Sequence, residues 1–295
     1  MQRGFLALFV SFIFILQISV SSLQAAIVLR QPATPLIVTR TSGSQQTVST
    51  SSTQLQPGAL LVQSNAALGS SAVVTDVTLS GTAETIAGSD DETGSVVLKA
   101  TAGGQSRVDL SLSGGVRSEV RSVDGSGSPV GLWSGPDGVQ HAISYHNLFT
   151  DPSWFFPALT VRRLVNITGL IGSYVGLENL NGQSVQHISF AKPPDAASAG
   201  PNAPVIQHLT QIDLYLDPTT LLPVALSFPT HPDNNELLDI PVQIQFSAYQ
   251  NINGVQIPFH IQKYLNGSLA LDLQVQAATL NTVIPASAFG AEITQ

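Results

Sequence analysis

The chain has 295 residues, of which 43% are hydrophobic and only 10% are charged, so it can bury a sizeable core and is not disordered throughout. Eleven Lys and Arg against 19 Asp and Glu give a net charge of −8, which disfavours nucleic acid as a partner because a phosphate backbone requires a basic surface. The absence of cysteine excludes disulfides, thiol catalysis and cysteine-based zinc sites.

The N-terminus has the pattern of an export signal. Arg3 precedes an apolar run over 5–20, and small residues up to Ala26 offer a cleavage site. We therefore predict that residues 1–25 are a signal peptide and that the protein is exported to a periplasm or to the extracellular space. The alternative is a retained membrane anchor, because the apolar run over 5–20 approaches the length of the shortest membrane spans. A typical span needs about 20 apolar residues, which favours the cleaved signal.

A segment rich in serine and threonine follows the signal. Ten of the fifteen residues in 39–53 are Ser or Thr, and such a stretch buries too little apolar surface to offset its chain entropy. We predict a flexible linker over 26–56 and a single β-rich domain over 57–295. Leucines at helical spacing before Gly69 predict that this domain begins with a short helix over 59–68.

After this helix the hydrophobic period changes from that of a helix to that of strands. Four short runs separated by glycine-containing turns predict antiparallel strands over 73–79, 95–102, 105–112 and 116–123. The segment 146–165 differs, because it contains clustered aromatics, two prolines and the pair Arg162-Arg163. We expect a loop with one or two helical turns there, beginning at Asp151-Pro152 with the aspartate as N-cap.

The C-terminal half shows the clearest alternation of apolar and polar residues. Apolar side chains occupy every second position in 242–248, 255–261 and 269–277, and Asn-Gly pairs such as Asn266-Gly267 lie in the links. Asn-Gly between alternating runs is a strong hairpin signal, so this half is predicted to be a meander of long antiparallel strands. The fold class is therefore mainly β.

A sheet with one apolar face must cover that face. A closed barrel, a sandwich, or a curved half-barrel roofed by helices would each satisfy this requirement. Any apolar concavity left between sheet and helices would bind an apolar ligand, whereas dry packing would leave a purely structural core.

Three segments of the sequence resemble motifs of the periplasmic lipoprotein-carrier superfamily (LolA/LolB-like). Asp213–Leu226 is similar to its strand–turn–strand element, Phe246–Pro258 to one of its hairpins and Asn281–Phe289 to its closing edge. The resemblance covers roughly residues 60–290 and is strongest in the C-terminal third. It implies an unclosed, strongly curved antiparallel sheet whose concave side is covered by a few short helices. It also implies non-covalent binding of acyl chains or of another apolar ligand.

The leading functional hypothesis is an exported, non-enzymatic protein that binds a lipid or a lipoprotein acyl chain. The residues predicted to line its binding site are apolar side chains of the aromatic segment and of the alternating strands: Trp154, Phe155, Phe156, Val242, Ile244, Phe246, Ile257, Phe259, Leu271 and Leu273. The alternatives are a structural or interaction protein of the cell envelope with a dry core and, third, a hydrolase with an unrecognised site. Nothing in the sequence indicates an oligomeric state.

Motifs of catalytic or metal sites are missing. No Gly-x-Ser-x-Gly elbow occurs, and the six histidines do not form a zinc motif such as His-Glu-x-x-His. The segment 231–239 is rich in oxygen ligands but lacks the spacing of an EF-hand, so we interpret its acids as solvated turn residues. The sequence thus predicts no catalytic residue, metal or cofactor.

Overall fold

The computed structural model describes residues 55–194 and 200–290. The predicted signal peptide (1–25) and all but the last two residues of the predicted linker (26–56) lie outside the described residues. Within the described ranges, no helix is both long enough and apolar enough to span a membrane.

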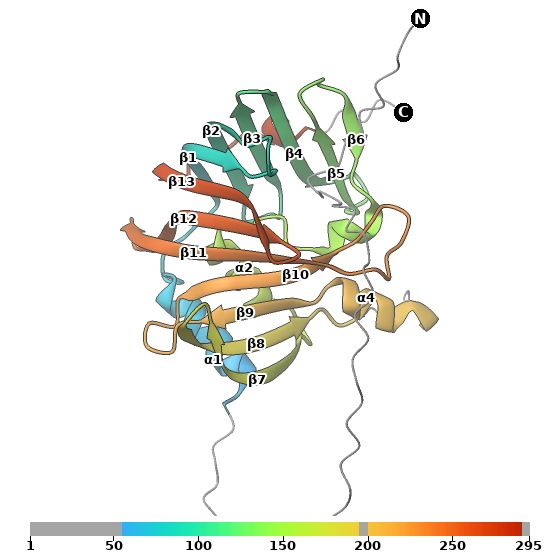
Figure 1. Cartoon of the computed structure of the whole chain (residues 1–295). Helices are drawn as coiled ribbons and strands as arrows, with labels where there is room; N and C mark the ends of the chain where they lie inside the picture. The colour runs from blue at the N-terminus through green and yellow to red at the C-terminus, as the bar shows by residue number, and fades with distance from the viewer. Residues whose placement is uncertain (1–54, 195–199, 291–295) are drawn as a thin grey trace, which may run out of the picture. The chain divides into compact units, whose positions relative to one another are not determined.

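A sheet of 13 antiparallel strands forms the framework (Figure 1). Its order is β6-β5-β4-β3-β2-β1-β13-β12-β11-β10-β9-β8-β7, so β6 and β7 are the two edges and the sheet is unclosed. The strands are β1 (Asp76–Thr85), β2 (Glu92–Thr101), β3 (Ser106–Leu112), β4 (Gly115–Val123), β5 (Pro129–Ser134), β6 (Gln140–Ala142), β7 (Ile171–Leu180), β8 (Gln183–Ala191), β9 (Ile212–Leu216), β10 (Pro223–Thr230), β11 (Ile240–Ile252), β12 (Val255–Leu265) and β13 (Ser268–Leu280).

The sheet consists of two meanders joined along one seam. Within each meander, β1–β6 and β7–β13, every strand pairs with its neighbours in the chain, and the two meanders are joined by the pairing of the first strand, β1, with the last, β13. Alternation places the core side chains: in β3, Val108, Leu110 and Leu112 are buried while the residues between them are more exposed. The prediction of a mainly β fold built on an unclosed antiparallel sheet is confirmed.

The Asn-Gly pairs make the hairpin turns that the sequence predicted. Asn266 and Gly267 between β12 and β13 have φ angles of 47° and 79°, and Asn253 and Gly254 between β11 and β12 have φ angles of 52° and 85°. Two consecutive residues with positive φ form the two-residue turn whose twist matches that of the flanking strands. The registers of these two hairpins are therefore determined locally.

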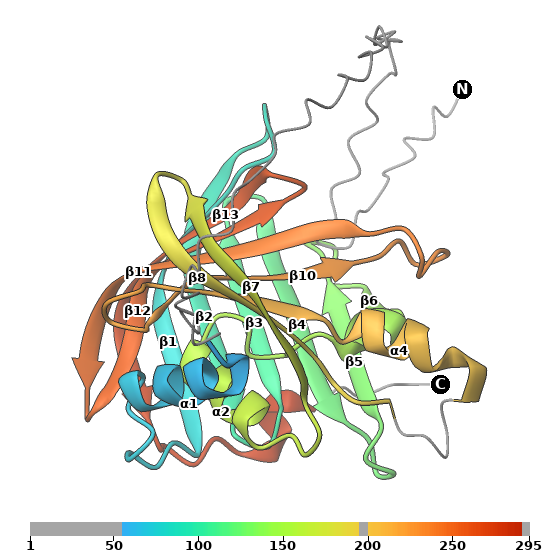
Figure 2. The same ribbon diagram turned by 90° about the horizontal axis from the view of Figure 1, so that it is seen from below.

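Short helices cover the concave side of the sheet. They are α1 (Pro57–Ala67) and α2 (Pro157–Val165). A third helix, α4 (Ala203–Leu209), contacts the 3₁₀ turns η1 (Tyr145–Phe149) and η2 (Gly200–Asn202), and the 3₁₀ turn η3 (Ala286–Phe289) contacts β3 and β4. Helices α1 and α2 pack on one another, and α2 also contacts β12. Figure 2 shows both helices inside the curve of the sheet. Their buried leucines, such as Leu61 and Leu159, belong to the same hydrophobic core as the strands.

The start of α2 differs from the prediction. The helix begins at Pro157 with Phe156 at its N-cap, not at Asp151-Pro152. Asp151 does accept the backbone N–H of Ser153 at 2.8 Å, as an N-cap would, but its carboxylate also pairs with Arg163 at the far end of the helix. The helix starts later, at Pro157, because the residues between the two prolines turn their aromatic side chains into the core.

Gly69 ends α1 and is packed against the β11–β12 hairpin. Its φ is +93°, and a Cβ at this position would lie 2.1 Å from the carbonyl oxygen of Gly254. We expect Gly69→Ala to destabilise the protein by about 2–3 kcal/mol, from left-handed backbone strain together with overpacking. Gly88→Ala is the matched control, because Gly88 has a φ of +77° but open space around it. Urea denaturation should show a clearly larger loss for Gly69→Ala, and equal losses would contradict the packing argument.

Candidate functional site

A pocket of about 580 Å³ lies between the two meanders, at the end of the sheet where α4 is attached. One side is formed by the end of β4 and the start of β5, and the other by α4, the start of β9 and β10. The segment from η1 to α2 contributes Leu148 to Pro152 and then Leu164. The lining thus joins parts of the chain that are distant in sequence.

Most of the lining side chains are apolar. They come from β4, β5, η1, α2, α4, β9 and β10 and the segments next to them: Val123, Pro129, Val130, Leu148, Phe149, Pro152, Leu164, Ile167, Pro193, Ile206, Ile212 and Phe228. In α2, Leu164 at the pocket lies on the same helix face as Val161, which is buried in the core, so the amphipathic pattern of one helix contributes to both. An apolar wall of this kind favours an apolar ligand group.

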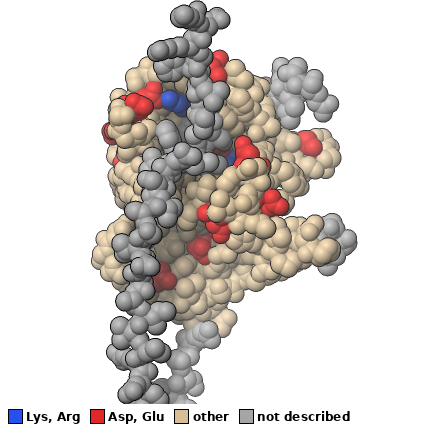
Figure 3. Space-filling view, turned by 45° about the vertical axis from the view of Figure 1, so that its right-hand side comes forward, with Lys and Arg blue, Asp and Glu red and all other residues tan. Residues whose placement is uncertain are grey.

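Cationic side chains are concentrated in this pocket. Arg121, Arg163 and Lys192 line it together with a single carboxylate, that of Asp151. The whole chain has only eleven Lys and Arg against 19 Asp and Glu, so the pocket reverses the balance of the protein. Figure 3 shows how sparse charged residues are on one face of the described part of the chain.

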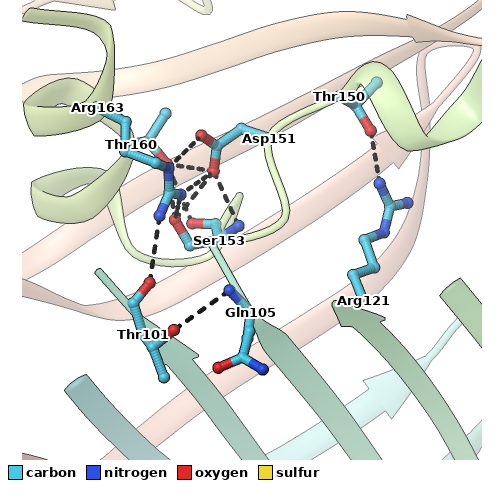
Figure 4. A network of polar contacts seen from close by, with 8 residues as sticks. All are labelled: Thr101, Gln105, Arg121, Thr150, Asp151, Ser153, Thr160 and Arg163. Carbon is cyan, nitrogen blue, oxygen red and sulfur yellow. Dashed lines mark hydrogen bonds and ion pairs between the residues drawn. The ribbon is translucent and has the colours of Figure 1, made fainter. Parts of the chain in front are cut away.

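Arg163 is held by a network of polar contacts (Figure 4). Its Nε lies 3.1 Å from Oδ2 of Asp151, it also donates to Ser153 Oγ, and its Nη1 lies 3.4 Å from the carbonyl oxygen of Thr101. Burial alone would raise the pKa of Asp151, but the charge and hydrogen bonds of Arg163 hold that pKa below its usual value. The Asp151 carboxylate is therefore ionised at neutral pH.

Arg121 is held in a similar way on the opposite wall. It pairs with Glu119 at 2.7 Å and donates to Thr150 Oγ1 at 2.7 Å and to the carbonyl oxygen of Asn147 at 3.1 Å. Burial would raise the pKa of Glu119, but the positive charges of Arg121 and Lys263 lower it. Both arginines thus have fixed positions, whereas the Lys192 side chain is exposed and makes no ion pair with the residues that the structure describes.

The ten residues predicted to contact a ligand lie in the core beside this pocket. Nine of them are at most 4% exposed, and Phe259 is half-buried and packs against the same core. The structure brings them together, but none of the ten is among the residues that line the pocket. Their contact with a ligand stays a prediction.

Sequence reasoning missed the cationic residues of the pocket. The pair Arg162-Arg163 was visible, but only Arg163 reaches the pocket, while Arg162 donates to the carbonyl oxygen of Ala72 at 2.9 Å. The available signal was the rarity of charge: in a chain with 10% charged residues, cations within an apolar segment point to a specific partner. No sequence pattern around Lys192 indicated that this residue lines a pocket.

Comparisons with known proteins give matches only at the level of structure. No protein-family model matches the sequence, and no curated protein matches it. The chain is similar to a putative outer membrane lipoprotein-sorting protein domain from Vibrio parahaemolyticus, with 13% identity, a TM-score of 0.48, and coverage of 78% of this chain and 94% of that one. It is also similar to a DUF1329 family protein from Desulfovibrio piger, with 10% identity, a TM-score of 0.49, and coverage of 81% and 98%.

A third similar structure is a LolA superfamily protein from Nitrosomonas europaea, with 11% identity, a TM-score of 0.43, and coverage of 80% of this chain and 98% of that one. What this chain binds has to be argued from its own residues, because similarities of this size do not carry function.

Proposed function

We propose that the protein is an exported binding protein that holds a lipid or a lipoprotein acyl chain in the pocket between α4, α2 and β5. The observation that carries the proposal is the pocket itself, with a volume of about 580 Å³ and mostly apolar walls. Pockets of roughly 300–1,000 Å³ with apolar walls and a few placed polar groups are typical of small-molecule sites.

The charges of the lining side chains indicate which polar group the ligand carries. Three cations against one carboxylate leave the pocket positive in a protein of net charge −8. Arg121 and Arg163 already have carboxylate partners, so Lys192 is the cation most available to a ligand. An acyl chain that carries an anionic group, such as a carboxylate or phosphate, therefore fits this pocket better than a neutral hydrocarbon.

Binding without catalysis agrees with the chemistry of the lining. Among the described residues of the pocket there is no histidine that would act as a base for Ser122, Thr150 or Thr210. The ionised Asp151 is occupied by Arg163 and by hydrogen bonds from Ser153. These groups orient and attract a ligand, and we assign them no chemical step.

Changes to the shape or the charge of the pocket are expected to weaken binding. In Ile206→Trp the larger side chain fills space beside α4, and in Lys192→Glu the charge of the most available cation is reversed. We expect each change to weaken binding of a fluorescent fatty acid by at least about tenfold, which corresponds to about 1.4 kcal/mol. Fluorescence titration of the purified proteins measures the dissociation constants.

Lys99→Glu is the matched control for charge, because it makes the same change on β2 outside the pocket lining. The uncharged fatty alcohol is the control ligand, and its binding should be affected by Ile206→Trp far more than by Lys192→Glu. No uptake of either probe by the wild-type protein would contradict the proposal and favour the structural role with a dry core. Unchanged binding in Ile206→Trp would place the ligand elsewhere.

A further inference from the structure

Two histidines and one aspartate from separate segments meet beside the pocket but outside its lining. His208 belongs to the last turn of α4, His231 directly follows β10, and Asp239 directly precedes β11. One imidazole nitrogen of each histidine and one carboxylate oxygen of the aspartate all lie within 4.8 Å of one another.

The three side chains converge on one point. Nε2 of His208 lies 2.8 Å and Nε2 of His231 lies 3.1 Å from the same oxygen, Oδ1 of Asp239. A tetrahedral zinc ion with ligands at about 2.0–2.2 Å separates neighbouring ligand atoms by roughly 3.3–3.6 Å. An ion would therefore need each histidine nitrogen to move away from the Asp239 oxygen by less than about 1 Å, and the two nitrogens, which lie within 4.8 Å of one another, to reach a similar separation. We propose that His208, His231 and Asp239 bind a divalent transition metal, with zinc as the best match.

The type of ligand selects the class of metal. Imidazole nitrogens suit zinc and its first-row neighbours, whereas calcium and magnesium prefer sites made entirely of oxygen. Two imidazoles and one carboxylate form a three-ligand set that leaves the fourth position for water. The side chains of His208 and Asp239 are 38% and 46% exposed, so an ion reaches the cluster directly from solvent.

The backbone of His231 is held in place by the side chain of Asn147. Its side chain is 1% exposed, and the buried amide of Asn147 contacts its backbone on both sides. The Asn147 Nδ2 donates to the His231 carbonyl oxygen at 2.8 Å, and the His231 N–H donates to Asn147 Oδ1 at 2.9 Å. The buried ring also has an Nδ1 without a hydrogen-bond partner among the described residues. The Nε2 atom of a side chain that is buried at the edge of the core thus faces the ligand groups of His208 and Asp239.

A metal ion bound by these three residues would stabilise one wall of the pocket. Ile206 of α4 and Thr210, the C-cap residue of this helix, line the pocket, and His208 lies between them in sequence. A metal bond from His208 to His231 and Asp239 would fix α4 against the β10–β11 connection and so hold one wall of the pocket. This consequence rests on the proposed function, but the metal site itself does not.

The test is a zinc titration of the untagged protein after treatment with EDTA. Isothermal titration calorimetry should show one equivalent of ZnCl₂ bound in the micromolar range or tighter, and no comparable binding of MgCl₂. His208→Ala and Asp239→Asn should each weaken zinc binding by at least about tenfold. Both residues are partly exposed, so the variants are expected to fold, which circular dichroism verifies.

His260→Ala is the matched control, because His260 also pairs with an aspartate, Asp272, at 3.0 Å but has no second histidine in its cluster. It should bind zinc like the wild-type protein. Hydrogen exchange of the α4 amides should slow when zinc is added to the wild-type protein and stay unchanged in His208→Ala. The proposal would be overturned if the wild-type protein bound no zinc, or if His208→Ala and Asp239→Asn bound zinc as tightly as the wild-type protein. Either outcome is independent of the result with fatty acids.

Discussion

Replacement of Phe155 by alanine is expected to lower the free energy of unfolding by about 3–5 kcal/mol, because it leaves a cavity in a close-packed core. Phe155 is 0% exposed and contacts Trp154 in an edge-to-face arrangement with ring centroids 5.5 Å apart. Urea denaturation followed by circular dichroism measures the loss. The control is Leu237→Ala, at a side chain that is 70% exposed, which should change stability by less than about 0.5 kcal/mol.

The same variant separates two roles of the aromatic segment. If Phe155 only fills the core, residual folded Phe155→Ala binds fatty acid like the wild-type protein below its unfolding transition. If the side chain also contacts the ligand, as the sequence predicted, affinity falls together with stability. A variant with unchanged stability would show that the core relaxes around the lost ring, and would contradict the burial argument.

Removal of the Asp151 carboxylate is also expected to lower the free energy of unfolding strongly. Asp151→Ala leaves the Arg163 guanidinium without its partner and removes the acceptor of Ser153 and Thr160. Breaking a buried ion pair on one side costs about 3–5 kcal/mol, and we expect about 3–4 kcal/mol because 15% and 23% of the two side chains remain exposed. The double variant Asp151→Leu/Arg163→Met should recover much of the loss, since no charge is then left unpaired.

The more exposed pair of Arg107 and Asp109, at 2.7 Å, is the control: Asp109→Ala should lower the free energy of unfolding by about 1 kcal/mol or less.

The pH dependence of the free energy of unfolding is a second test of the Asp151 charge. Because the folded pKa of Asp151 is lowered, its stabilisation is fully present above the unfolded pKa of about 3.9 and is lost as the pH falls through the folded pKa. The stability difference between wild type and Asp151→Ala should therefore shrink below about pH 4. A difference that stays constant down to pH 2 would contradict the role of the charge.

The parts of the fold that local chemistry determines could be predicted from the sequence. Alternation in β11 and β12 together with Asn253-Gly254 specified a hairpin, because side-chain period and turn geometry act over a few residues. The predicted start of α2 at Asp151-Pro152 was wrong, since tertiary packing of the aromatic residues that follow moved the start to Pro157.

The candidate site was harder to predict than the fold. The pocket takes Arg121 from β4, Lys192 from the end of β8 and Ile206 from α4, and no local pattern announces that these segments meet. The same holds for His208, which is far in sequence from His231 and Asp239. Apolar patterning indicates which face of a strand is buried, but only the tertiary arrangement determines which buried surface remains unfilled.

The pairing of β1 with β13 has a consequence for how the chain reaches its structure. Val77 lies opposite Leu280, so the seam that unites the two meanders joins opposite ends of the folded segment. During synthesis from the N-terminus, the edge of the β1–β6 meander at β1 stays unpaired until the final strand emerges. Closing so long a loop is slow, and during that wait the exposed edge of β1 is the place where the chain is most open to wrong strand partners.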